Sequence, residues 1–148
     1  MNRIKTFVTG AALALATTLA MPAAAQESSY KRGTVWEVGR IDVMPGQFEN
    51  YMDWLAGQWK QVNELAKADG IVVDYHVLAS TNPRAGEPDV ILIIEYKDYQ
   101  TTAQREAFNK KVGSMLQQDN RKAGAASAER VKMREQMGSV QYQEMILK

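Results

Sequence analysis

One long amphipathic segment constrains the fold of this chain more than any other feature of its sequence. From Gln47 to Ala68, apolar side chains recur every three or four residues, which is the spacing of one face of an α-helix. Pro45-Gly46 precedes the segment and Asp69-Gly70 follows it, and both pairs are typical of turns. The sequence therefore predicts one helix over 47–68, with an apolar stripe made of Phe48, Tyr51, Met52, Leu55, Trp59, Val62 and Ala66.

Segments rich in β-branched and aromatic residues flank this helix, and they predict strands over 33–44, 71–80, 88–97 and 139–148. Thr101 and Gln104 have the spacing of a capping box, which predicts the start of a second helical region. That region is broken and continues over 120–137 until Gly138. The order β-α-β-β-α-β predicts an α+β fold of the ferredoxin-like kind, with one antiparallel sheet and helices on one face.

The second face of this sheet is expected to be partly apolar. In the strand over 71–80, Ile71, Val73, Tyr75 and Val77 alternate with Val72, Asp74, His76 and Leu78. In the first strand, Trp36 and Val38 alternate with Glu37 and Gly39. An exposed sheet face that is half apolar is a natural association surface, so we expect a homodimer.

The N-terminus has the layout of a cleavable secretory signal peptide. Arg3 and Lys5 are followed by an uncharged stretch rich in Ala and Leu, and Ala23-Ala24-Ala25 supplies the small residues of a cleavage site. We expect cleavage after Ala25 and export to the periplasm or the medium. The prediction is thus a signal peptide over 1–25, a flexible tail over 26–32 and a single domain over 33–148.

Composition argues against several function classes. The chain has no Cys, which rules out disulfides, thiol chemistry and Cys-based metal sites. Without Arg3 and Lys5, the 18 basic residues fall to 16 against 17 acidic ones, so neither nucleic acid nor an anionic membrane surface is an expected partner. The longest apolar run after the leader, Val90 to Ile94, is far too short for a membrane anchor. With one His and no metal-ligand spacing, we expect no metal and no cofactor.

The element order, Pro45-Gly46, the long helix with Tyr51 and Trp59, and the Leu92–Tyr96 strand together resemble the dimeric α/β-barrel superfamily. The C-terminal part, with Arg134-Glu135 before Gly138 and the ending Glu144–Lys148, is similar to small exported bacterial proteins of unknown function. The resemblance implies two ferredoxin-like subunits that pair their sheets into a barrel. That superfamily contains cofactor-free monooxygenases, polyketide cyclases and haem-binding enzymes, so the resemblance implies a fold and no particular reaction.

His76, the only histidine, is the leading candidate for acid–base chemistry. It shares a predicted strand face with Asp74, and a carboxylate beside an imidazole can orient a general base near neutral pH. The competing interpretation is a hydrogen-bonded histidine at the dimer interface. Trp36, Tyr75, Tyr96 and Tyr142 are candidates for an aromatic ligand pocket, although aromatic residues on strands more often pack in a core.

The sequence thus leaves two functions open. The first is an exported dimer that binds a small hydrophobic or aromatic compound between sheet and helices, with cofactor-free acid–base chemistry by His76. The alternative is a non-catalytic dimer that serves as a binding or envelope-stress module. A pocket in which His76, Asp74 or a tyrosine converge would favour the first, and a histidine in a dry interface would favour the second.

Overall fold

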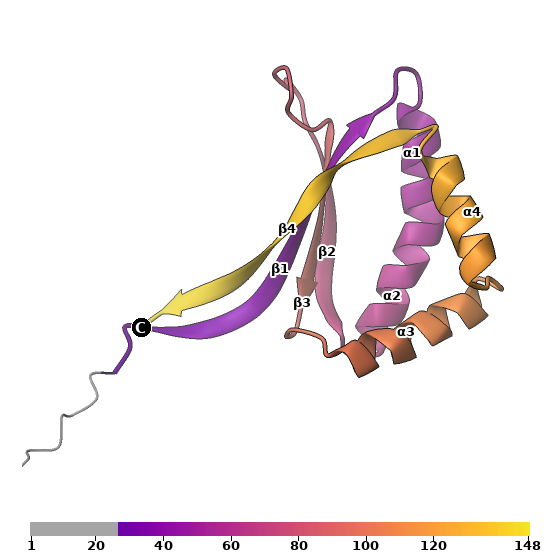
Figure 1. The fold of residues 1–148 in the computed structure, drawn as a ribbon. Coiled ribbons are helices and arrows are strands. Elements are labelled where there is room, and N and C mark those ends of the chain that lie inside the picture. Colours follow the sequence, from indigo (N-terminus) through magenta and orange to yellow (C-terminus); the bar gives the residue numbers. More distant parts are fainter. Residues whose placement is uncertain (1–26) are drawn as a thin grey trace, which may run out of the picture.

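A computed structural model describes residues 27–148 and shows an α+β fold, as the sequence predicts (Figure 1). The predicted signal peptide lies outside the described residues. Four strands, β1 (Tyr30–Val43), β2 (Val72–Ala79), β3 (Val90–Tyr96) and β4 (Arg134–Leu147), form one sheet in the order β2-β3-β1-β4. Every neighbouring pair is antiparallel.

The long helix predicted over 47–68 is present, but it is not uniform. It consists of α1 (Phe48–Trp54), a π-helical turn η1 (Leu55–Trp59) and α2 (Lys60–Ala68). Asn63 is buried just beyond the wide turn, and its side-chain amide donates to the carbonyl oxygen of Trp59 at 2.9 Å. Such π turns inside α-helices occur frequently at functional sites.

The second helical region is divided into α3 (Thr102–Met115) and α4 (Asn120–Arg130). The predicted capping box is confirmed, because Thr101 accepts from the backbone N–H of Gln104 and the Gln104 side chain accepts from the N–H of Thr101. Gln117, with a φ of 52°, lies in the left-handed region just after α3, and Asp119 caps α4. These two residues cause the break between the helices.

The helices all lie on one side of the sheet (Figure 1), where the main core forms. Ile41 of β1, Val90 of β3 and Tyr51 and Leu55 of the long helix are buried against one another. Burial of such apolar side chains is the principal stabilising term of a fold of this size. The core is concentrated near the start of the long helix.

The other side of the sheet, which we call the open face, is covered by no element within residues 27–148 (Figure 1). Strand alternation and register place Trp36 and Val38 of β1, His76 and Leu78 of β2, Ile91 and Ile93 of β3, and Val140 and Tyr142 of β4 on this face. Half of the Leu78 surface and 48% of the Val140 surface remain exposed. The open face therefore carries a cluster of partly accessible apolar side chains, and the same register places the charged residues Arg40, Asp74 and Glu95 around it.

Strands β1 and β4 run past the ends of β2 and β3 and form a two-stranded arm that ends at the C-terminus (Figure 1). Tyr30 pairs with Leu147 and Arg32 with Met145. Residues 30–32, expected in a flexible tail, thus belong to β1. The sequence interpretation missed them because a strand whose two faces are solvated carries no clear alternation.

Two further expectations are corrected by the structure. Residues 134–137 were expected to be helical, but they form the start of β4, where Arg134 pairs with Val43 and Gln136 with Ile41. Gly138 consequently does not end a helix. In β2, a bulge at Val73 reverses the alternation, so that Val72 is buried on the helix side, the same side as the partly buried Val77. Within the described residues, no helix is long and apolar enough to cross a membrane.

Candidate functional site

The predicted pair of Asp74 and His76 lies on β2, with Oδ2 of Asp74 3.9 Å from Nε2 of His76. That separation exceeds a hydrogen bond. The other carboxylate oxygen of Asp74 accepts from Nζ of Lys67 at 3.1 Å and from the N–H of Tyr75 at 2.9 Å. These contacts, Lys67 foremost, hold the pKa of Asp74 below its usual value. Asp74 is thus engaged mainly by α2, and His76 projects from the open face.

Two of the four predicted pocket residues also lie on the open face. Trp36 and Tyr142 are direct register partners on β1 and β4. The indole N–H of Trp36 donates to Oγ1 of Thr34 at 3.0 Å. Tyr142 remains 55% exposed. The two rings form part of an apolar surface, and neither borders a cavity described below.

The other two, Tyr75 and Tyr96, lie on the helix side of the sheet. The hydroxyl of Tyr75 donates to Oε1 of Glu64 at 2.5 Å. The rings of Trp59 and Tyr75 pack edge to face, with their centres 5.2 Å apart. The Glu64 carboxylate, above all, raises the pKa of Tyr75 to about 12. Tyr75 therefore joins α2 to β2. Of the six residues proposed from sequence, only Tyr96 lines one of the hollows described here.

Three adjoining hollows, which we call the cleft, lie along the helix side of the sheet; the second is lined by strand residues alone, and the third lies between β3 and the helices α2 and α3. Their volumes are about 210, 260 and 270 Å³. They adjoin because Glu37 lines the first and second, Ile94 the second and third, and Tyr96 and Arg105 the first and third. None of the cavity-lining residues except Ile41 belongs to the buried core cluster, so the cleft lies beside the main core.

Small side chains on neighbouring strands explain the empty space. Gly39 of β1 pairs with Ser139 of β4 on one side and with Leu92 of β3 on the other. A Cβ placed on Gly39 would meet only Leu92 atoms at 3.8 Å, which is ordinary van der Waals contact. A larger residue at this position would therefore fill the cleft without forcing the backbone to move.

Polar groups gather at one end of the cleft. Glu37 accepts from the side-chain amide of Gln141 at 3.2 Å. Burial, together with the Glu37 carboxylate, raises the pKa of Tyr96 to about 12. Arg105 of α3 also lines this end. A carboxylate, a neutral phenol, an amide and a guanidinium thus border one hollow that is open to solvent on its side toward Tyr99 and Arg105, which suits a ligand with one polar substituent.

The opposite part of the cleft is more apolar. Val62 and Ala66 of α2, Ile94 of β3 and Phe108 of α3 line it together with the buried Asn63. A surface hollow of about 540 Å³ shares Phe108 with this part and extends beneath the ion pair between Lys111 and Asp69. The hollow lies where β3 leads into α3 and is bordered by the same Phe108 ring as the cleft.

Sequence reasoning missed Glu37, Gln141 and Arg105. A signal existed in β1, where Glu37 and Gly39 alternate with Trp36 and Val38. Because Trp36 and Val38 are the more apolar pair, the pattern gives no reason to place Glu37 under the helices. Only the register of β1 with its neighbours shows that Glu37 faces inward.

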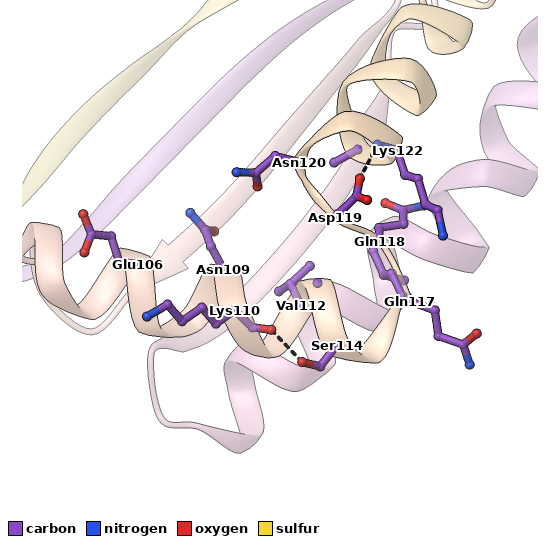
Figure 2. A pocket seen from close by; sticks show the side chains of 13 residues that line it. Glu106, Asn109, Lys110, Val112, Ser114, Gln117, Gln118, Asp119, Asn120 and Lys122 are labelled. Carbon is purple, nitrogen blue, oxygen red and sulfur yellow. Dashed lines mark hydrogen bonds between the residues drawn. The ribbon is translucent and has the colours of Figure 1, made fainter.

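A larger but open hollow of about 1040 Å³ lies in the angle between α3 and α4. Figure 2 shows that its labelled side chains are mostly polar and come from both helices and the turn between them. Asp119 is used there to cap α4 through the N–H of Lys122 at 2.8 Å. The hollow is thus a solvated corner of the fold. Residues 27–148 contain no group of three or more His, Cys, Asp or Glu side chains arranged to hold a metal ion.

No protein-family model and no curated protein matches the chain. Among solved structures, the crystal structure of HapK from Hahella chejuensis is similar at 14% sequence identity and a TM-score of 0.46. The similarity covers 74% of this chain and 91% of HapK.

Proposed function

We propose that this protein is an exported homodimer in which each subunit binds a small hydrophobic or aromatic molecule in the cleft. The observation that carries the proposal is the set of adjoining hollows on the helix side of the sheet, with polar groups gathered at one end. Sites for small organic molecules are typically cavities with apolar walls and a few convergent polar groups.

The lining indicates the chemistry of the ligand. Ile94, Leu92 and Phe108 offer apolar walls, which favour a flat or branched hydrocarbon part. Arg105 and the hydroxyl of Tyr96 offer donors, and Glu37 offers an acceptor. A ring system with one hydroxyl, carbonyl or acidic substituent would satisfy both parts.

The dimer in this proposal uses the open face. The strand order β2-β3-β1-β4, antiparallel throughout, supports a ferredoxin-like subunit. The uncovered apolar residues of its sheet support pairing into a dimeric α/β barrel. Export rests on the leader over 1–25 alone.

Acid–base chemistry on a ligand in the cleft would use Glu37 and Tyr96, because His76 lies on the other side of the sheet. Catalysis by His76 and Asp74 stays a prediction, and its site would be the open face. The position of His76 on that face also favours the alternative of a non-catalytic dimeric binding or envelope-stress module, in which the histidine would be an interface residue.

Adjacent residues of β3 allow a matched test of the binding site. Ile94 lines the cleft, whereas Ile93 faces the opposite side of the sheet. With the fluorescent probe 8-anilino-1-naphthalenesulfonate, we expect I94F to weaken binding by about tenfold or more and I93F to leave it nearly unchanged. G39V, which fills the cleft from another strand, should act like I94F. Weakening by I93F alone would place the probe on the open face and refute the proposal.

A further inference from the structure

Two arginines lie side by side over a pair of stacked aromatic rings. Tyr51 and Trp54 of α1 stack with ring centres 5.8 Å apart and planes 10° apart. The guanidinium carbon of Arg130, at the end of α4, lies 5.0 Å from the centre of the Trp54 ring. That of Arg134, at the start of β4, lies 5.7 Å from Tyr51 and 5.9 Å from Trp54. The rings thus fix both cations in one place.

Neither arginine has an acidic partner within residues 27–148. No ion pair there involves Arg130 or Arg134. The neighbouring Glu129 pairs with Lys132 at 2.5 Å, and Glu135 alternates to the other face of the sheet opposite Asp42. Burial, and then the charge of Arg134, lower the pKa of Arg130. Two like charges held together in a partly desolvated place are unfavourable without a counter-charge.

The two guanidinium groups are half-buried in a way that leaves their outer nitrogens available. Each Nε atom and the Tyr51 hydroxyl are buried without a hydrogen-bond partner in the described part of the chain. The terminal nitrogens are not among these buried atoms, and no hydrogen bond to a described residue uses them, so they reach solvent. Their N–H groups can donate in pairs to an oxyanion, as arginine typically does.

We propose that Arg130 and Arg134, whose guanidinium groups pack on the rings of Tyr51 and Trp54, form a binding site for a doubly charged oxyanion such as phosphate. The dianion balances the two cations and accepts from the outer N–H groups of both. None of the four residues lines the cleft. This site is therefore independent of the proposed small-molecule function, and each can fail without the other.

The probe for this site is inorganic phosphate, titrated at constant ionic strength with chloride as the balancing anion. Specific binding to the folded state raises the melting temperature in a saturable manner. We expect an increase of about 2–4 °C for the unsubstituted protein, and its loss in both R130Q and R134Q. Sulfate should act like phosphate, since the site recognises charge and oxygen geometry.

R121Q is the matched control, because it removes the same charge from the same helix, α4, as R130Q does. Arg121 is exposed and makes no ion pair within residues 27–148. R121Q should keep the full phosphate response. If R130Q or R134Q fails to fold, calorimetric titration of R130K and R134K with phosphate replaces the melting experiment. Lysine keeps the positive charge but lacks the planar guanidinium group. Each lysine variant should bind phosphate about tenfold more weakly than the unsubstituted protein. The proposal is refuted if phosphate leaves the melting temperature of the unsubstituted protein unchanged, or raises that of the variants equally. The arginines would then only pack on the aromatic rings.

Discussion

Tyr96 and Tyr75 have similarly high pKa values for different reasons. For Tyr96 the main cause is burial in the cleft, with Glu37 as a second cause, whereas for Tyr75 it is the hydrogen bond to Glu64. Both phenols stay protonated well above neutral pH. The Tyr96 hydroxyl consequently enters the cleft as a donor and not as an anion, which defines what part of a ligand can lie against it.

The burial of Tyr96 predicts an alkaline loss of stability. The unfolded chain releases the phenol proton near its ordinary pKa of 10.0, while the folded protein keeps it to about 12. The unfolded state therefore binds fewer protons in this interval, and the free energy of unfolding falls as the pH rises from about 10 to 12. In Y96F the fall should be less steep. Urea unfolding across this interval measures the slope, and an identical slope in both proteins would contradict the assignment.

At the level of single residues, the sequence located candidate side chains but not their faces. His76, Trp36 and Tyr142 lie on the open face, whereas Tyr75 and Tyr96 lie beneath the helices. Both faces of this sheet carry apolar residues, so alternation alone does not tell the inner face from the outer one. The bulge at Val73 shifts the alternation of inward and outward side chains in β2 by one residue, and nothing in the local sequence indicates it.

Among the elements, those with strong local signals were predicted best. The apolar stripe over 47–68 and the capping box at Thr101 correspond to helices in the structure. The π turn at Leu55–Trp59 leaves the apolar stripe uninterrupted, so the periodicity did not indicate it. The sequence predicts helix at the start of β4 because Arg134–Met137 contains good helix formers, but pairing with β1 overrides that propensity.

The capping box predicts a specific cost for one substitution at the start of α3. In T101A the N–H of Gln104 loses its side-chain acceptor, and we expect a loss of about 1 kcal/mol in the free energy of unfolding. T102A is the matched control, since Thr102 is the first residue inside the helix and only accepts from Arg105 at 3.3 Å. Chemical denaturation of both variants measures the difference. Equal losses would mean that the cap does not stabilise α3.

For the molecule as a whole, the α+β class and the succession of strands and helices could be read from hydrophobic periodicity and turn residues. The cleft could not. It arises where Gly39, Ser139 and the helix-facing residues of three strands meet, and such a space depends on register and on how the helices cross the sheet. The same holds for Arg130 and Arg134, which α4 and β4 bring over the rings of α1.

The open face leads to the prediction at the largest scale. Val38 lies on the central strand β1, with Ile93 of β3 and Val140 of β4 as its register partners, so it occupies the middle of the apolar surface. A symmetric dimer formed through this face would bring two copies of Val38 close to its axis. A stable interface of this kind buries on the order of 1,600 Å² in total.

In V38E, two carboxylates would have to be buried without partners in the dimer, whereas in the isolated subunit each would face water. We therefore expect sedimentation at micromolar concentration to give twice the subunit mass for the unsubstituted protein and the subunit mass for V38E, with folded circular dichroism spectra for both. V131E is the control, because Val131 follows α4, belongs to no strand and is 65% exposed; it should remain dimeric. A folded monomer without substitution, or a dimeric V38E, would exclude the open face as the interface, and the apolar residues there would then need another partner.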